Sequence, residues 1–216
     1  MFQPYFFRQF FNVRIEYTLM VLGKEVEDII SDGNFTFIEI NCIPERFESC
    51  FSKMEFITAY HYMQDLIKRI PVQSLSFSLP ESIYSGKSRE FMEHLKNRNR
   101  IHSRREITEM EREFEKDFRN MSRNPPIMCG TMSLFDSFGK DIQGFGENII
   151  FTGFNTETDI MYNVMIAADR GFLPIVLSDG VSGPWEMRHF NALEMMSRFS
   201  YVIDTRDVME LMGDHI

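Results

Sequence analysis

The sequence predicts an α/β protein of three layers, in which helices cover both faces of a Rossmann-like, mostly parallel sheet of six strands. Short apolar runs of strand length recur along the chain, and each is bounded by polar or turn residues. Stretches with helical periodicity lie between these runs. A chain of 216 residues is long enough for one such domain with extensions and can bury a large core.

The strands are placed at the apolar runs, and the helices at the periodic stretches between them. The predicted strands are residues 35–42, 72–79, 125–129, 148–154, 173–179 and 200–205. The predicted helices are residues 51–70, 157–171 and 189–199, with a further helix-like stretch at 106–118. Pro71 ends the first of these helices, and Arg170 followed by Gly171 is a stop signal for the second.

Residues 35–216 are predicted to form the domain, and two segments differ from it. Residues 1–34 form an N-terminal extension in which NVRIEYTLMVL fits a strand or a helix, and its phenylalanines could cover a sheet edge or a subunit interface. Residues 87–123 form a charged insertion with 11 Lys and Arg against 8 Asp and Glu. A solvated insertion, a lid and a docking surface for an acidic partner all fit this composition.

Charge and cysteine usage exclude several classes of protein. The net charge of −9 and the pI near 5.1 argue against binding to nucleic acid, which needs a positive face. Cys42, Cys50 and Cys129 are odd in number and lack zinc-site spacing, so we expect a cytoplasmic protein without disulfides. No apolar run approaches the length of a membrane span, so no membrane association is expected.

Residues 148–205 contain a G-x-x-T turn, an A-x-x-x-G helix end, a strand ending in Asp and an H-x-x-A-L helix. The residues of these motifs are Gly153, Thr156, Ala167, Gly171, Asp179, His189, Ala192 and Leu193. This pattern resembles the isochorismatase-like cysteine hydrolases, a superfamily that includes nicotinamidases and N-carbamoylsarcosine amidases. A weaker similarity extends to residues 127–138, through Ser133 and Phe135, and to residues 35–41.

The resemblance implies a catalytic Asp, Lys and Cys at the carboxyl ends of the strands, and this sequence replaces all three. The nucleophile position falls on Asp159, the lysine position on Cys129 and the aspartate position on Asn41. A shift of one residue would put Cys42 in place of Asn41. A thiolate at a helix N-terminus is stabilised by the helix dipole, so its replacement removes the group that the family's chemistry requires.

Asp159 has several interpretations. With Thr156 as N-cap, TETD fits a capping box that would hold Asp159 ionised at the third helical position. An acid–base or metal-binding role and a contact to a ligand are the alternatives. Cys129 is either a buried, inert cysteine or a displaced nucleophile.

The turn before Asp159 is expected to keep the form of an oxyanion site. Phe154, Asn155, Thr156 and Thr158 are its predicted members, and the resemblance implies a cis peptide between Phe154 and Asn155. His189 is expected to cap or pack its helix. No cofactor is expected, and no metal site, because the corresponding segment 79–86 has no histidine.

The sequence therefore predicts an isochorismatase-like protein that is inactive as a cysteine hydrolase. It would bind a small molecule in a relict pocket or serve as a structural or interaction subunit. The alternative is an active hydrolase with rearranged catalytic residues, acting on a small amide-like or carbamoyl metabolite. The resemblance and the aromatic N-terminus also predict a homo-oligomer.

Overall fold

A computed structural model describes residues 26, 28, 29, 33, 35–69, 72–80, 107–121, 125–137 and 145–208 of the chain. The predictions made for residues 1–25, for residues 81–106 and for the segment 138–144 therefore lie outside the described residues. Val26 is buried against the sheet, in an apolar cluster with Phe35 and Phe37.

The centre of the molecule is the predicted six-stranded sheet, and every pair of neighbouring strands runs parallel. The strands are β1 (Phe35–Ile40), β2 (Gln73–Ser78), β3 (Ile127–Met128), β4 (Asn148–Phe154), β5 (Leu173–Ser182) and β6 (Tyr201–Ile203). Their order across the sheet is β3-β2-β1-β4-β5-β6, so the chain starts in the middle and builds outward in both directions. The strand order reverses between β1 and β4, where an open parallel sheet commonly binds its ligands.

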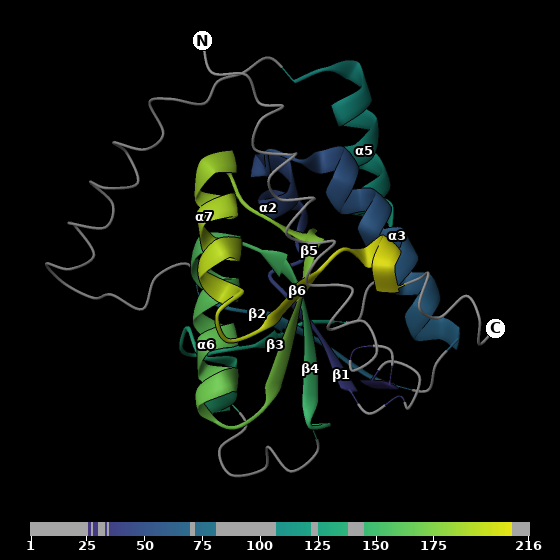
Figure 1. Ribbon diagram of the computed structural model, residues 1–216. Coiled ribbons are helices and arrows are strands. Elements are labelled where there is room, and N and C mark those ends of the chain that lie inside the picture. Colours follow the sequence, from purple (N-terminus) through teal and green to yellow (C-terminus); the bar gives the residue numbers. More distant parts are fainter. Residues whose placement is uncertain are drawn as a thin grey trace, which may run out of the picture.

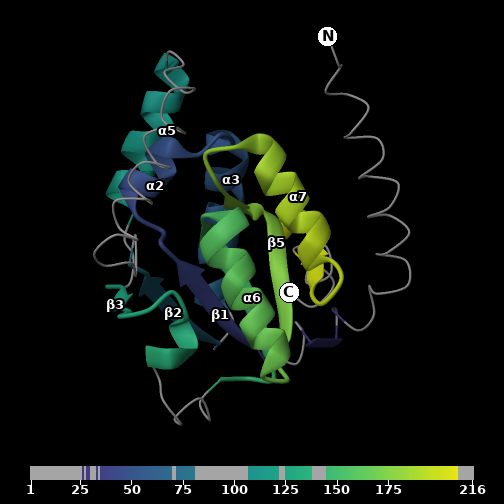
Figure 2. The same cartoon turned by 90° about the vertical axis from the view of Figure 1, so that its left-hand side faces the viewer.

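Helices cover both faces of this sheet, which confirms the predicted three-layer α/β fold (Figure 1). The helices are α2 (Pro44–Ser49), α3 (Lys53–Arg69), α5 (Glu109–Asn120), α6 (Met161–Asp169) and α7 (Glu186–Met196). Figure 2 shows α6 and α7 side by side over one face, with α2, α3 and α5 on the other. The strands alternate accordingly, because Ile38 and Ile149 face the α6–α7 side while Phe37 and Ile150 face α3.

The predicted elements differ from the observed ones mainly at their ends. β5 continues three residues beyond the predicted end at Asp179 and reaches Ser182. The strand predicted at 125–129 is reduced to two paired residues, and the short helix α2 was not predicted. The helix predicted at 157–171 begins instead with a π-helical turn, Thr156–Ile160, which leads into α6.

β1 and β4 approach each other most closely at Gly153. This residue pairs with Ile40 and has a φ of +118°, a backbone conformation that glycine adopts without penalty. A Cβ atom at position 153 would overlap the carbonyl oxygen of Ile40. The glycine of the G-x-x-T turn therefore lets β4 lie against the end of β1.

The described part of the charged insertion, residues 107–121, contributes to the core. Phe118 of α5 is fully buried, and its ring stacks on that of Phe47 with centroids 4.4 Å apart. These two rings belong to an apolar cluster with Phe56, Tyr60 and Phe154. Aromatic side chains bury large apolar areas, so this cluster binds α5 firmly to α2 and α3.

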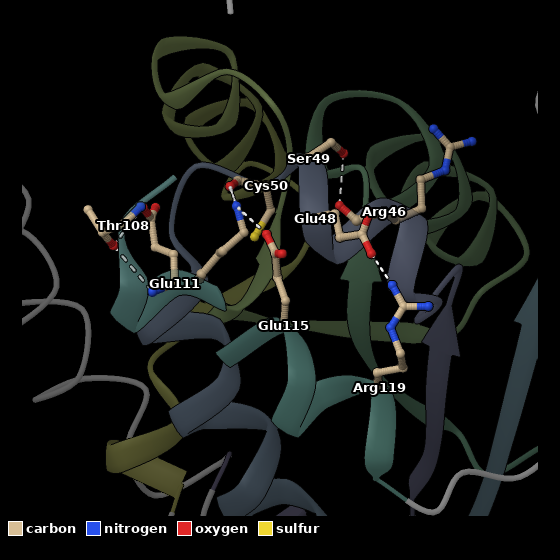
Figure 3. A network of polar contacts seen from close by, with 9 residues as sticks. Arg46, Glu48, Ser49, Cys50, Thr108, Glu111, Glu115 and Arg119 are labelled. Carbon is tan, nitrogen blue, oxygen red and sulfur yellow. Dashed lines mark hydrogen bonds and ion pairs between the residues drawn. The ribbon is translucent and has the colours of Figure 1, made fainter. Parts of the chain in front are cut away.

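Ion pairs support the same contact (Figure 3). Arg119 of α5 pairs with Glu48 of α2. The ammonium group of Lys53 lies 3.5 Å from the carboxylate of Glu115 and donates to the carbonyl of Cys50 at 3.3 Å. Lys53 is only 6% exposed, so Glu115 and the carbonyl supply the partners that a buried ammonium needs.

We found no helix in the described part of the chain with both the length and the apolar character that a membrane span requires.

Phe118→Ala should destabilise the domain by about 3–5 kcal/mol, since it removes a fully buried ring and leaves a cavity among aromatic side chains. Urea denaturation followed by circular dichroism measures the change. Met110→Ala on the same helix is the control, because Met110 is exposed and its loss should cost less than about 0.5 kcal/mol. Equal effects of the two changes would contradict the burial of α5.

Candidate functional site

Asn41 lies at the carboxyl end of β1 and ties it to the neighbouring strand β2. Its backbone has a φ of 51°, which asparagine tolerates better than most residues. Its N–H donates to the carbonyl of Phe77 at 2.8 Å, and its side-chain oxygen accepts from the N–H of Leu79 at 2.8 Å. The amide nitrogen Nδ2 is buried near the carboxyl group of Asp159 and has no partner at normal hydrogen-bond distance among the described residues.

Asp159 lies in the π-helical turn that follows β4 and is 4% exposed. Its carboxylate accepts a hydrogen bond from the N–H of Asn155 at 3.1 Å and one from the hydroxyl of Thr158 at 3.4 Å. Burial raises the pKa of Asp159, although the Asn155 N–H, the charge of Arg46 and the side chain of Asn41 oppose the shift. Asn41 and Asp159 are therefore neighbours at the switch point of the sheet.

Two details of the predicted capping box are wrong. The N-cap of the turn is Asn155, and the hydroxyl of Thr156 is bonded instead to Nδ1 of His189 at 2.9 Å. Asp159 was expected to be a stable anion, but its burial favours the protonated form and raises its pKa. A π-helical turn contains one residue more than an α-helical turn. The carboxylate of Asp159 therefore reaches the N–H of Asn155, four positions earlier in the chain.

Cys129 follows the edge strand β3. Strand β2 lies between β3 and β1, so Cys129 is separated from Asn41 and Asp159. Its N–H donates to the carbonyl of Ser78 at 2.9 Å, and its thiol donates to the carbonyl of Ile127 at 3.8 Å. The side chain packs in the apolar cluster beneath α6, with Leu134 among its members. These surroundings favour a thiol over a thiolate.

Cys42 and Cys50 lie in the aromatic cluster around Phe47 and are also buried. Burial raises the pKa of Cys50 to about 11, even though Lys53 nearby lowers it. A thiol with such a pKa is a poor nucleophile at neutral pH.

The turn residues predicted from the resemblance are arranged around Asp159. The peptide bond between Phe154 and Asn155 is cis, as the resemblance predicts. Phe154 points away into the aromatic cluster, with its ring centroid 4.3 Å from that of Phe56. Asn155 contributes its backbone N–H to Asp159, and its side-chain oxygen is buried without a hydrogen-bond partner.

His189 packs as expected and is 4% exposed. Its ring lies edge-on to Phe51, and burial lowers the pKa of His189 to about 4. The imidazole is therefore neutral at physiological pH, and its bond to Thr156 joins α7 to the π-helical turn.

Two carboxyl groups were missed by the sequence analysis, the half-buried Glu157 and the buried Glu39. Glu157 precedes Asp159 by two residues, and its carboxyl group lies against Gly183, where a Cβ atom would overlap it. Burial is the main cause that raises the pKa of Glu157, and its atom Oε2 has no hydrogen-bond partner. Glu39 lies within β1 and accepts from Tyr60 at 3.0 Å and from Gln64 at 2.8 Å. The sequence could have pointed to Glu39, because this residue is charged and stands within an otherwise apolar strand.

Three polar atoms of Asn41, Asn155 and Glu157 have no hydrogen-bond partner at normal distance in the described part of the chain. Asn41 Nδ2 is a donor, while Asn155 Oδ1 and Glu157 Oε2 are acceptors, and all three are buried. Buried polar atoms are costly unless a protein group, a water molecule or a ligand satisfies them. Arg46 and Arg188 lie close enough to lower the pKa of Glu157. Within the described ranges, no cluster of three His, Cys, Asp or Glu side chains could hold a metal ion.

Comparison with known proteins agrees with this architecture. Residues 139–207 match the model of the isochorismatase domain. No curated protein sequence matches the chain significantly.

Several solved structures share the fold. The MAR1 ribonuclease of Caenorhabditis elegans is 14% identical, with a TM-score of 0.56 over 82% of this chain and 81% of that one. A putative MAR1 ribonuclease of Leishmania major is 10% identical, with a TM-score of 0.57 over 86% and 85%. A cysteine hydrolase of Pseudomonas syringae pv. phaseolicola is 12% identical, with a TM-score of 0.55 over 85% and 95%.

The chain therefore has the isochorismatase-like hydrolase fold, and its C-terminal part carries the sequence pattern of the isochorismatase domain.

Asp159→Asn should change how stability depends on pH. Folding raises the pKa of Asp159, so the folded protein binds this proton more tightly than the unfolded chain, and the carboxyl group costs stability as pH rises above about 4. Asparagine keeps an acceptor for the Asn155 N–H and does not ionise. The unfolding free energy of the variant minus that of the wild type should increase between pH 4 and pH 7.

Urea denaturation at several pH values measures this difference. Asp169→Asn is the control, because Asp169 is exposed at the end of α6 and its replacement should give a flatter profile. A difference that decreases with rising pH would mean that the Asp159 carboxylate is stabilised by the fold.

Proposed function

We propose that this chain is an isochorismatase-like protein that does not act as a cysteine hydrolase and that binds a small polar ligand beside Asn41 and Asp159. The observation that carries the proposal is the carboxylate at the position where the resemblance expects the nucleophilic sulfur. Asp159 uses the N–H of Asn155, a member of the turn that would otherwise stabilise an oxyanion. The carboxyl group of Asp159 thus occupies an N–H that a developing oxyanion would need.

The unpartnered atoms support the ligand-binding part of the proposal. Asn41 Nδ2 can donate to a ligand oxygen, while Asn155 Oδ1 and Glu157 Oε2 can accept from ligand N–H or O–H groups. A small neutral molecule with both kinds of group, such as a primary amide, would complement these atoms without needing a charged partner. An ordered water molecule could satisfy the same atoms, and ligand titration separates the two cases.

The proposal excludes thiol chemistry by the three cysteines of the sequence. All three are buried, and Cys50 has a pKa raised to about 11. Purified protein should show no turnover above background with amides, carbamoyl compounds or isochorismate. Turnover that is abolished by Cys129→Ala or Cys42→Ala would overturn the proposal.

Binding is tested by thermal denaturation with a panel of small amides and carbamoyl compounds. A ligand should raise the midpoint of unfolding in a concentration-dependent way, because it binds only the folded state. Asn41→Ala should weaken that binding by about tenfold, since it removes one buried hydrogen bond of about 1–2 kcal/mol. Ser49→Ala is the matched control, because Ser49 is exposed on α2 and bonds the carbonyl of Arg46.

A second candidate is an active enzyme that uses carboxyl groups in place of the thiol. The observation in its favour is the pair Glu157 and Asp159. Burial raises the pKa of both carboxyl groups, and the charge of Asp159 adds to the shift of Glu157. Turnover of any substrate in the panel that persists in cysteine variants and is lost in Asp159→Asn would favour this candidate over the first.

Ribonuclease activity has less support, although MAR1 ribonucleases share the fold. Identities of 10–14% carry no information about substrate, and a net charge of −9 disfavours a polyanion. Single-stranded RNA belongs in the substrate panel, and its cleavage by the purified protein would contradict the proposal.

A further inference from the structure

The loop that follows β3 carries a buried hydroxyl group that the site has not yet accounted for. This loop contains Thr131, Met132 and Ser133 and leads into a short 3-10 turn, Leu134–Ser137. Ser133 is 3% exposed, and its hydroxyl oxygen is buried without a hydrogen-bond partner among the described residues. Such a hydroxyl group has given up its bonds to water, so its presence in a native structure calls for an explanation.

The loop around Ser133 is stabilised without this hydroxyl. A serine that precedes a helical turn commonly accepts a hydrogen bond on its side chain, but here the N–H of Asp136 donates to the backbone carbonyl of Ser133 at 3.3 Å. The hydroxyl of Thr131 lies 3.0 Å from that carbonyl and 3.2 Å from the carboxylate of Asp136, and it can donate to either. Thr131 therefore supplies the side-chain contact of the loop, and the hydroxyl of Ser133 is left for another purpose.

Asn163 of α6 holds this loop against the turn that contains Asp159. The side chain of Asn163 is fully buried and bonds three backbone groups. Its Oδ1 accepts from the N–H of Leu134 at 2.9 Å, while Nδ2 donates to the carbonyls of Met132 at 2.9 Å and of Asp159 at 2.8 Å. Both neighbours of Ser133 are therefore bonded to one side chain, which also bonds the π-helical turn. This arrangement fixes Ser133 beside that turn.

We propose that the hydroxyl of Ser133 is a further ligand contact of the site beside Asn41 and Asp159. Asn163 is then the positioning residue that holds this hydroxyl in place. The inference rests on the proposed binding of a small polar ligand, and it specifies the chemistry of that ligand. The other unpartnered atoms of the site complement a primary amide, and a serine hydroxyl can both donate and accept a hydrogen bond. The ligand is thus a small hydroxyamide, with a hydroxyl group one or two carbons from the amide.

The first test asks whether the protein itself satisfies the hydroxyl of Ser133. Ser133→Ala removes a group to which the described residues offer no partner, so the urea midpoint of unfolding should stay unchanged or rise. Ser182→Ala is the matched control, because Ser182 is also buried but bonds the hydroxyl of Ser52 at 2.8 Å, so this midpoint should fall. A fall for Ser133→Ala as large as that of the control would overturn the proposal.

The second test compares three amides of similar size by isothermal titration calorimetry. The probes are propionamide, lactamide and the isomer of lactamide that carries its hydroxyl on the terminal carbon. The wild type should bind one of the two hydroxyamides about tenfold more tightly than propionamide, because only these can bond Ser133. Ser133→Ala should remove this preference, whereas Asn41→Ala should weaken all three complexes. Ser49→Ala, on the exposed side of α2, should change none of them.

The outcomes of this titration separate the inference from the proposed function. If no amide binds the wild type, the proposed function fails and the inference fails with it. If propionamide binds and the hydroxyamides bind no better, the proposed function stands and the assignment of Ser133 is overturned. The same holds if the preference survives in Ser133→Ala. An ordered water molecule on Ser133 gives equal binding, since a ligand hydroxyl would then gain nothing over the water.

Asn163→Ser tests the positioning role. Serine is too short to bond both the loop and the π-helical turn, so the urea midpoint should fall, and circular dichroism verifies that the variant is folded. A positioning residue should lose the preference for the hydroxyamide while propionamide still binds. A residue that only stabilises the fold would weaken all three complexes by the same factor, and this result would overturn the role proposed for Asn163.

Discussion

The close contact between β1 and β4 determines where everything else at the site can lie. Gly153 presents no side chain to the carbonyl of Ile40, so the two central strands stay paired up to their carboxyl ends. The next residue of β1 is Asn41, and the residues that follow β4 form the turn that contains Asp159. Because both strands end at the same level, an amide and a carboxyl group meet at the switch point of the sheet.

Position 159 combines a conserved-looking local geometry with a carboxyl group at the place where the resemblance implies a nucleophilic cysteine. The cis peptide, the helix start and the bond from Thr156 to His189 all surround position 159, yet the position holds a carboxyl group with a raised pKa. Burial raises the pKa of this carboxyl group, whereas a helix N-terminus stabilises a thiolate, so the chemistry proposed for the site differs from that of the cysteine hydrolases.

The sequence was sufficient for the fold and for part of the site. Apolar runs and helical periodicity located all six strands and the main helices, because both patterns are local. The positions of Asn41 and Asp159 followed from the ends of strands. The hydrogen bonds of Thr156 and Asp159 could not be predicted, since one extra residue in the π-helical turn changes which N–H the carboxylate reaches. The burial of Phe118 was also hidden, because it depends on rings that come from α2, α3 and β4.

The two edges of the sheet have a further consequence for the behaviour of the protein at high concentration. β3 consists of two residues and β6 of three, so each edge strand presents few backbone groups that another chain could pair with. Long, exposed edge strands are templates for amyloid-like growth, and short ones are a known protection. The described edges of the sheet therefore offer little opportunity for uncontrolled strand addition.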